Sequence, residues 1–336
     1  MRRMRFFGLV AMVPLVLGVA SDCTRTPPAR GLQRVSTRIK WLPGVTYAGS
    51  YVARERGYWR QAGLDVEIFP GGFEADPIKL VAAGSNHFGI TGAEQLLQAR
   101  AEGVPIVAIY AELRRSPAGW MALRRSGISR PQQFVGKRVG AQYGTNIEPT
   151  LDALLAKLGV DPRSLMRVPV RYDLAPFYSR RVDVMPVYLT GQPILARMQG
   201  FDVVTIDPAE YGIEMCGNVY FTSERLIARR PDLVQGFVSG LVRGWHDVVE
   251  RPEEAVDLML RVEPSLKREE ERAFLSATIP YIWGGSTDSL GIMSRDQWLA
   301  TRDIMVRYAG LPASTTVESA FTNRFVLAAY QDRGRK

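Results

Sequence analysis

The sequence predicts an α/β fold with two lobes, each built as a sheet of strand–helix–strand units with helices on both faces, and a ligand cleft between the lobes. Two observations lead to this prediction. Short apolar strands alternate with helices from residue 38 to residue 206, an order typical of mostly parallel sheets. The 336 residues are also enough for a large core and for two domains or lobes.

The clearest strand–helix–strand unit covers residues 38–72. A short strand ends at a Pro-Gly turn, a helix follows with apolar residues at helical spacing, and apolar and acidic residues then alternate in a second strand. Ligands of such sheets lie beyond the carboxyl ends of the strands. We therefore expect Trp41 and Tyr47, which follow the first strand, to line the cleft.

Further units complete the first lobe and build the second. In the first lobe we expect helices at 74–83 and 94–102 and strands at 87–91, 106–111 and 120–123. In the second lobe we expect strands at 137–141, 166–170, 182–188 and 202–206, with helices at 148–158 and 191–198. Amphipathic helices follow at 223–250, 253–260, 267–276 and 294–309, with a last segment to residue 330. We expect these helices to pack on the first lobe.

The ligand site should combine aromatic side chains at strand ends with a few polar groups, because concave small-molecule sites have this composition. Flat heteroaromatic ligands stack on such rings, and the free N–H groups at a helix start favour the polar edge of a ligand. The candidates are Trp41, Tyr47, Glu94, Tyr143, Thr145, Asn146, Tyr188 and Gln192. The alternative for the aromatic residues is a place in the core, and for the polar residues a role as helix caps.

The N-terminus has the pattern of an export signal. Three arginines among the first five residues precede an apolar run at 6–20, which is too short to span a bilayer comfortably. The small residues that follow end in Cys23, as in bacterial lipoprotein signals, although Asp22 departs from the usual small residue. We expect lipidation of Cys23. The alternatives are cleavage nearby and an uncleaved membrane anchor.

The part of the chain before the first strand has two expected segments. Residues 24–36 have little apolar content and are typical of a flexible segment. We expect a signal peptide at 1–22 and a flexible tether at 23–36.

The first unit also resembles a known family. From Trp41 to Ile68 the chain has the pattern Trp-Leu-Pro-x-x-x-Tyr-Ala-Gly-x-Tyr-Val-Ala-x-x-x-Gly-Tyr-x-x-x-x-Gly-Leu-Asp-Val-Glu-Ile. This pattern resembles the opening of periplasmic solute-binding proteins of ABC importers, in the branch that handles thiamine-pyrimidine precursors, alkanesulfonates and riboflavin. The resemblance extends to about residue 330 and implies a type II periplasmic binding protein fold. It also implies a discontinuous first lobe at 37–123 and 223–331 and a second lobe at 124–222.

The resemblance implies an exported monomer without a cofactor that captures a small heteroaromatic vitamin or precursor. Lobe closure around a thiamine pyrimidine precursor or riboflavin would be followed by delivery to a permease and its ATPase. A lipid on Cys23 would hold the protein at the membrane. An alternative is an alkanesulfonate or other small-anion binding protein of the same fold, in which Arg171, Arg180 and Arg181 would meet the anion.

A further alternative is the synthase of the thiamine pyrimidine, which shares this fold and consumes a histidine of its own. That enzyme has a cysteine-rich run, of which Cys216 alone is present here, and an Asn-His pair near the first helix, where this chain has Gly44-Val45-Thr46-Tyr47. The resemblance therefore favours a binding protein, with Cys216 as a structural residue.

Charge and motifs exclude several other classes of function. The net charge of +9 is spread along the chain without a basic cluster, which disfavours nucleic-acid binding. His87 and His246 are the two histidines and lie far apart in sequence, so a His-rich metal site is not available. The sequence contains no phosphate loop, His-Glu-x-x-His helix or Gly-x-Ser-x-Gly elbow. We expect neither a metal nor an enzyme.

Overall fold

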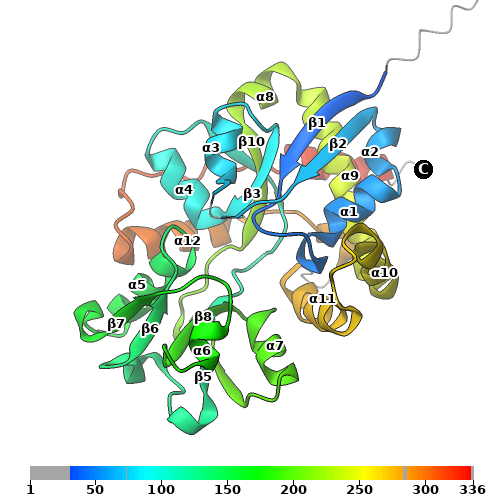
Figure 1. Ribbon diagram of the computed structural model, residues 1–336. Helices are drawn as coiled ribbons and strands as arrows, with labels where there is room; N and C mark the ends of the chain where they lie inside the picture. The colour runs from blue at the N-terminus through cyan, green and yellow to red at the C-terminus, as the bar shows by residue number, and fades with distance from the viewer. Residues whose placement is uncertain (1–30, 73, 283–285, 334–336) are drawn as a thin grey trace, which may run out of the picture. The chain divides into compact units, whose positions relative to one another are not determined.

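Two five-stranded sheets form the framework of the computed structural model, which describes residues 31–72, 74–282 and 286–333 (Figure 1). The first sheet has the order β2-β1-β3-β10-β4 and the second the order β7-β6-β8-β5-β9. The first contains β1 (Gln33–Arg38), β2 (Leu64–Phe69), β3 (Phe88–Gly92), β4 (Ile106–Ala111) and β10 (Asn218–Ser223). The second contains β5 (Ala118–Leu123), β6 (Arg138–Ala141), β7 (Met166–Pro169), β8 (Val184–Tyr188) and β9 (Val203–Ile206).

Each sheet has one strand that runs against the others. In the first sheet β1 is parallel to β2 and β3, whereas β10 is antiparallel to β3 and β4. In the second sheet β6 is parallel to β7 and β8, whereas β5 is antiparallel to β8 and β9. The carboxyl ends of the parallel strands therefore lie at one edge of each sheet, the edge at which α/β proteins hold their ligands.

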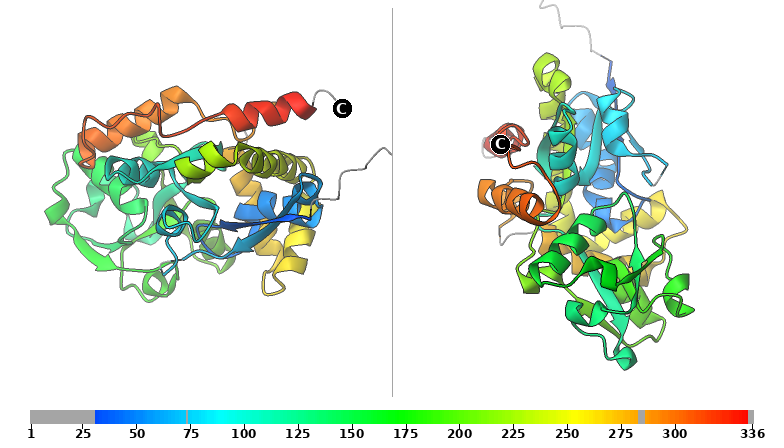
Figure 2. Two further views of the ribbon diagram at one scale, coloured as in Figure 1. Left: turned by 90° about the horizontal axis from the view of Figure 1, so that it is seen from above. Right: turned by 90° about the vertical axis from the view of Figure 1, so that its left-hand side faces the viewer.

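Helices cover both faces of the sheets, and Figure 2 shows these layers from two further directions. Those before β10 are α1 (Ala48–Glu55), α2 (Tyr58–Gln61), α3 (Pro77–Ala82), α4 (Ala93–Ala101), α5 (Ile147–Lys157), α6 (Ala175–Tyr178) and α7 (Gln192–Met198). Those after it are α8 (Glu224–Arg229), α9 (Pro231–Glu250), α10 (Pro252–Val262), α11 (Arg268–Ile282), α12 (Arg295–Tyr308) and α13 (Arg324–Arg333). Within the described residues, no helix has the length and apolar character needed to cross a bilayer.

The core of the first lobe depends on close packing of α1 against α9. Trp245 on α9 is fully buried, and a Cβ atom added to Gly49 on α1 would lie 2.3 Å from its ring. A Cβ atom added to Gly244 would lie 2.1 Å from the carbonyl oxygen of Gly49. The two helices can approach this closely because neither glycine has a side chain.

The chain crosses between the sheets earlier than the predicted lobe boundaries at residues 123 and 223. β5 pairs with β8 and β9 and so belongs to the second sheet, which places the first crossing between Ala111 and Ala118. The return occurs before Asn218, the first residue of β10. The sequence of β5 is apolar like that of any buried strand, and its pairing partners are selected by distant residues. Its local pattern therefore could not assign it to a sheet.

The predicted tether at 23–36 also needs correction at its end. β1 begins at Gln33, whose backbone N–H donates to the carbonyl oxygen of Gly63 at 2.9 Å, and Val35 is buried. Residues 33–36 thus form part of the first sheet, because alternate side chains of this polar strand reach the core. The predicted signal peptide at 1–22 and the lipidation site at Cys23 lie outside the described residues.

Two chain segments join the sheets and run side by side. The N–H of Leu113 donates to the carbonyl oxygen of Asn218 at 3.0 Å, and the N–H of Ser116 donates to that of Met215 at 2.9 Å. A Cβ atom added to Gly217 would lie 2.5 Å from the carbonyl oxygen of Leu113, so this close contact requires glycine. α12 adds a third connection, since it packs against both α4 and α5.

Candidate ligand-binding site

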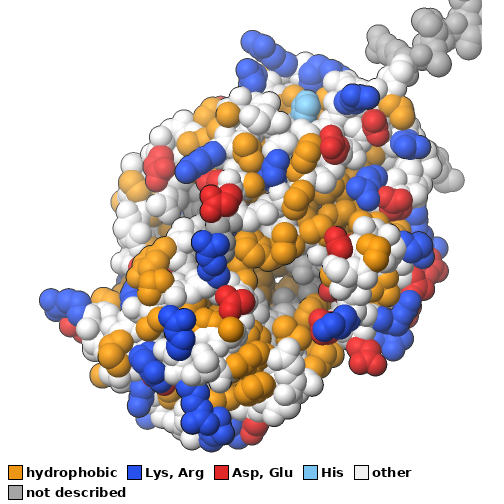
Figure 3. Space-filling model, in the orientation of Figure 1, with side chains coloured by type: hydrophobic (Ala, Val, Ile, Leu, Met, Phe, Trp, Pro, Cys, Tyr) orange, Lys and Arg blue, Asp and Glu red, His pale blue; other side chains and the backbone are white. Residues whose placement is uncertain are grey.

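A cleft between the two sheets contains two adjoining cavities that share Lys40, Trp41 and Tyr172. Their volumes are about 300 Å³ and about 270 Å³. The face in Figure 3 is hollowed at its centre, with hydrophobic side chains gathered around the hollow. Both cavities have walls from both lobes, so a molecule inside either one would touch both.

The two cavities differ in character. The larger has aromatic and apolar walls that include Trp41, Tyr47, Tyr172, Tyr188, Leu195 and Phe274. The smaller is more polar, with Lys40, Asp76, Lys79, Thr91, Gln95 and Thr145 among its lining residues. A ligand with a flat ring and a polar substituent would match this division.

The cleft residues converge because they stand at corresponding ends of strands. Trp41 follows β1, Tyr172 follows β7, and Tyr188 is the last residue of β8. These are carboxyl ends of parallel strands, which meet at one edge of each sheet. Asn218 begins β10, and because this strand is antiparallel its start lies at the same edge.

Trp41 and Tyr172 make direct contact across the cleft. Their ring centroids are 4.1 Å apart and their planes are inclined by 50°. An aromatic pair in this geometry contributes about 0.5–1.5 kcal/mol beyond its buried area. The pair joins the two lobes at the boundary between the two cavities.

The ammonium group of Lys40 also joins the lobes. Its Nζ donates to Asn146 Oδ1 at 3.2 Å, to the Tyr188 hydroxyl at 3.1 Å and to Asn218 Oδ1 at 3.2 Å. Asn146 and Tyr188 belong to the second lobe, whereas Lys40 and Asn218 belong to the first. The backbone of Lys40 is held against Gly71, where an added Cβ atom would lie 2.5 Å from the Lys40 carbonyl oxygen.

Two buried carboxyl groups lie near this ammonium group. Glu94 is 1% exposed and Glu112 is 0% exposed, and none of their four side-chain oxygens has a hydrogen-bond partner. Burial raises the pKa of Glu94 to about 7 and that of Glu112 to about 8, and Lys40 opposes both shifts. Asn218 and Tyr220 lie near enough to Glu112 to oppose its pKa shift as well, but without hydrogen-bond geometry.

The tyrosines of the cleft remain neutral hydrogen-bonding groups. Burial, followed by the charge of Glu112, raises the pKa of Tyr47 well above its usual value. Burial, followed by Glu94, raises the pKa of Tyr188, and burial raises that of Tyr172 to about 12. The Tyr188 hydroxyl donates to Asn146 Oδ1 at 2.9 Å. These hydroxyl groups offer polar contacts at the edge of an aromatic wall.

The structure brings the eight predicted site residues to the cleft or its border. Trp41, Tyr47, Tyr188 and Gln192 line the larger cavity, and Trp41, Tyr143 and Thr145 line the smaller one. Glu94 lines a third cavity that shares Gln95 and Thr145 with the smaller one, and Asn146 reaches the cleft through its bonds to Lys40 and Tyr188. Their role in ligand binding stays a prediction.

Two of the eight also hold the backbone of their own lobe, although neither α5 nor α7 has a side-chain cap. Gln192 Oε1 accepts a hydrogen bond from the backbone N–H of Tyr188 at 2.9 Å. Thr145 Oγ1 accepts one from the N–H of Ile147, the first residue of α5, at 3.3 Å. Tyr143 is 57% exposed and lies at the mouth of the smaller cavity.

Sequence reasoning missed two residues that line the cleft, Lys40 and Tyr172, and two buried residues that interact with Lys40, Asn218 and Glu112. Lys40 and Tyr172 follow parallel strands, so the strand-end rule that selected Trp41 would have found both. Glu112 follows β4 in the same way. Asn218 gave no such signal, because its position depends on the antiparallel direction of β10.

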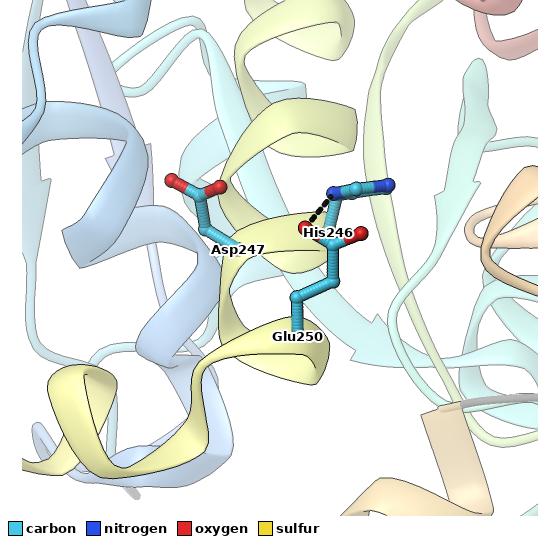
Figure 4. A group of neighbouring side chains, drawn as sticks. All are labelled: His246, Asp247 and Glu250. Atoms are coloured by element: carbon cyan, nitrogen blue, oxygen red, sulfur yellow. Dashed lines mark ion pairs between the residues drawn. The ribbon is translucent and has the colours of Figure 1, made fainter.

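Among the residues that the structure describes, one group of side chains has the spacing of a metal site, and it lies outside the cleft. The ligand atoms of His246, Asp247 and Glu250 on α9 lie within 4.8 Å of one another, and Figure 4 shows the ion pair between His246 and Glu250. Asp247 pairs with Arg56 at 2.6 Å and with Arg251 at 2.5 Å. These two guanidinium groups would repel a cation, so the group is better described as an ion-pair network.

Several relatives of this chain are known. It is 28% identical to the riboflavin-binding protein RibY of Chloroflexus aurantiacus, over 97% of this chain and 99% of RibY. It is 28% identical to the formylaminopyrimidine-binding protein of Halalkalibacterium halodurans, over 76% of this chain and 79% of that protein. It is 26% identical to the 4-amino-5-hydroxymethyl-2-methylpyrimidine phosphate synthase of Legionella pneumophila, over 74% and 79% of the two chains.

The fold matches that of a solved periplasmic binding protein. The alkanesulfonate-binding protein SsuA from Xanthomonas axonopodis pv. citri, bound to MOPS, aligns with a TM-score of 0.66 at 17% identity, over 88% of this chain and 99% of SsuA. The predicted fold class is therefore confirmed. Residues 45–255 also match the NMT1/THI5-like family model. This protein belongs to the NMT1/THI5-like family.

Proposed function

We propose that this protein is the substrate-binding component of an ABC importer and captures a small heteroaromatic vitamin or vitamin precursor in the cleft. The observation that carries this proposal is the convergence of aromatic side chains from both lobes on one cavity: Trp41 and Tyr47 from the first, Tyr172 and Tyr188 from the second. Relatives named for the binding of riboflavin and formylaminopyrimidine support it. A thiamine pyrimidine precursor and riboflavin are accordingly the first candidates for the ligand.

Capture would proceed by closure of the two lobes around the ligand. The ring stacks on the aromatic wall, while Asn146, Gln192 and Glu94 meet its polar edge. Contacts that exist only when both lobes touch the ligand stabilise the closed form. The closed form then docks on the permease.

The polar groups of the cleft favour a ring over an anion. Sulfonate sites use arginine or the N-termini of helices, whereas the cationic side chains among the residues that line the two cavities are Lys40 and Lys79. The buried carboxyl groups of Glu94 and Glu112 would repel an anion whenever they are ionised. Size agrees, since one cavity of about 300 Å³ is at the lower end of the range for small-molecule sites.

The positions of the histidines favour binding over catalysis. The related synthase consumes a histidine of its own, so such an enzyme needs one beside its ligand. His87 Nδ1 accepts a hydrogen bond from the backbone N–H of Ser36 at 3.1 Å, and His246 pairs with Glu250 on α9. Neither histidine is among the residues lining the two cavities.

Export and membrane attachment are part of the proposal. The basic and apolar segments of residues 1–22 would direct secretion, and a lipid on Cys23 would then hold the protein at the outer side of the membrane. Mass spectrometry of the N-terminal peptide from cells tests this part. We expect a peptide that begins with diacylated cysteine; an unmodified N-terminus elsewhere would contradict lipidation.

A thermal-shift screen tests the ligand assignment. We expect one of formylaminopyrimidine, hydroxymethylpyrimidine, thiamine and riboflavin to raise the melting temperature, because a ligand that binds only the native state stabilises it. Taurine serves as the sulfonate probe. A shift with taurine alone would move the protein to the sulfonate branch, and no shift with any of the five would contradict the assignment.

The same screen on variants locates the site. Trp41→Ala should weaken binding by about 1–3 kcal/mol through loss of a stacking face. Tyr211→Ala is the matched control, since Tyr211 is an aromatic residue outside the residues that line the two cavities. Equal loss of the thermal shift in both variants would contradict the proposed place of the ligand.

A further inference from the structure

Lys40, Glu94 and Glu112 lie at the base of the cleft, and their charged groups do not form hydrogen-bonded ion pairs with one another. An ammonium group has three N–H donors, and Lys40 directs hydrogen bonds to three uncharged oxygens, those of Asn146, Tyr188 and Asn218. The carboxyl groups of Glu94 and Glu112 receive no hydrogen bond from it or from any other described residue. Lys40 nevertheless acts on both through its charge.

Two ionised carboxylates and one ammonium cannot all be stable in this environment. Like charges in a space with little water repel strongly, and an unpaired buried carboxylate costs several kcal/mol. One ammonium compensates one carboxylate, and the other carboxyl group then keeps its proton. The base of the cleft is therefore close to neutral as long as Lys40 is present.

The unpartnered oxygens define the hydrogen bonds that a ligand can make there. A buried carboxyl oxygen without a partner has a desolvation cost that a donor from a ligand removes. Glu94 lines the third cavity, which adjoins the smaller one, whereas Glu112 lines none of the three, so the two unpartnered oxygens of Glu94 would favour a ligand with N–H or O–H groups. The nearby cation would repel any ligand that brings a positive charge of its own.

We propose that Lys40 is the charge-selecting residue of the cleft: a built-in counter-cation for Glu94 and Glu112 that restricts the site to uncharged, hydrogen-bond-donating ligands and excludes cationic ones. This inference rests on the proposed function in one respect, since it assumes that the ligand occupies this cleft. Beyond that function, we predict the charge of the ligand and assign the selection of that charge to the side chain of Lys40.

Removal of the ammonium group should reverse the selection. In Lys40→Met the two carboxyl groups lose their cation, and an ammonium group on a ligand can take its place. Such a ligand displaces a proton from a carboxyl group, so its affinity rises with pH. The other titratable groups around the carboxyls are Tyr47, Tyr110, Tyr188, Tyr220 and Cys216, and burial raises the pKa of each of them, so they stay neutral through this range.

Calorimetric titration with a matched pair of ligands tests the proposal. The pair is 4-amino-5-hydroxymethyl-2-methylpyrimidine and its 5-aminomethyl analogue, which have the same size and differ by an ammonium group in place of a hydroxyl group. The purified protein should prefer the hydroxymethyl compound by about tenfold or more. Lys40→Met should bind the aminomethyl compound at least about tenfold more tightly than the unaltered protein does, and the gain should grow from about pH 6 to about pH 8.5.

Two further variants control the experiment. Lys137→Met removes an exposed lysine outside the residues that line the two cavities and should leave the preference unchanged. The triple variant Lys40→Met/Glu94→Gln/Glu112→Gln should lose the gain for the aminomethyl compound, because neither carboxyl group remains to hold a cation. Thermal melting of each variant without ligand establishes that it is folded.

Two results would overturn the proposed role of Lys40. Equal binding of the two compounds by the unaltered protein would overturn the inference, and so would failure of folded Lys40→Met to bind the aminomethyl compound. If the unaltered protein binds no pyrimidine and no riboflavin while Lys40→Met binds the aminomethyl compound, the charge rule stands and the ligand assignment of the proposed function fails.

Discussion

At the residue scale, Glu94 and Glu112 make the stability of the protein depend on pH. Both are buried without a hydrogen-bond partner, and an arrangement of this kind favours the protonated form of a carboxyl group. Folding therefore takes up protons at these positions near neutral pH. Both carboxyl groups oppose folding when they ionise.

We expect the free energy of unfolding to fall between about pH 5 and about pH 8. Burial raises the pKa of Glu94 to about 7 and that of Glu112 to about 8, whereas both lie at about 4.3 in an unfolded chain. The folded protein thus binds more protons than the unfolded chain in this range, and stability is lost as pH rises through the folded pKa values. The effect should be on the order of a few kcal/mol, measured by denaturant unfolding at several pH values.

The double variant Glu94→Gln/Glu112→Gln provides the comparison. Its stability should be flatter between the same pH values, because amides do not titrate. His87 acts in the opposite direction, since burial lowers its pKa and its contribution to stability is lost as pH falls, but it is present in both proteins. A pH slope that the double variant leaves unchanged would contradict this assignment.

The sequence identified the aromatic members of the site better than the charged ones. Trp41 and Tyr188 were predicted because an aromatic residue at a strand end has few roles besides the core and a ligand wall. Lys40 precedes Trp41 in the chain, but a lysine at a strand end is usually solvated, and nothing local indicates the three hydrogen-bond acceptors around it. Those acceptors come from residues up to 178 positions away, which no local pattern encodes.

At the scale of elements, α1 and α9 are held together at the positions of Gly49 and Gly244. The sequence predicted both helices from their apolar periodicity, and α9 has the long amphipathic pattern expected for residues 223–250. Their close approach was not predicted, because a glycine inside a helix indicates low helix propensity before it indicates a contact. The structure assigns these two glycines to packing.

Gly244→Ala should destabilise the protein by about 1–3 kcal/mol, the usual cost of overpacking a core. The added Cβ atom would meet the carbonyl oxygen of Gly49 at 2.1 Å, and a backbone atom cannot move aside as a side chain can. Gly236→Ala on the same helix is the control, since its nearest neighbour would be Leu64 Cδ1 at 3.2 Å. Thermal unfolding that shows equal losses for the two variants would refute the packing role of Gly244.

At the scale of the whole molecule, the two lobes touch across the cleft through a few side chains. Trp41 meets Tyr172, and Lys40 reaches Asn146 and Tyr188. The two segments that join the sheets, 112–117 and 207–217, and α12 connect the lobes elsewhere, so loss of the cleft contacts would leave the connection intact. The fold class of two α/β lobes was predictable from the repeated strand–helix pattern, whereas the crossing points were not, because β5 and β10 are defined by their partners.

We expect the double variant Asn146→Ala/Tyr172→Ala to favour an open arrangement of the lobes. Both substitutions remove contacts of the second lobe with the first, and closure in hinged proteins depends on such contacts. Small-angle X-ray scattering should detect a radius of gyration larger by roughly 1 Å. Tyr211→Ala, which leaves the cleft contacts in place, should match the unaltered protein, and an unchanged radius in the double variant would contradict the proposed closure.

The position of β10 between β3 and β4 has a consequence for the order in which the protein is made. Every strand of the second sheet comes from one continuous stretch, 118–206, whereas the first sheet lacks an inner strand until residues 218–223 have been synthesised. The synthesis of the first sheet therefore begins before that of the second sheet and ends after it. A ribosome or a secretion channel that releases the chain from its N-terminus delivers an unfinished first sheet, whose unpaired strand edges stay exposed until the second sheet has emerged.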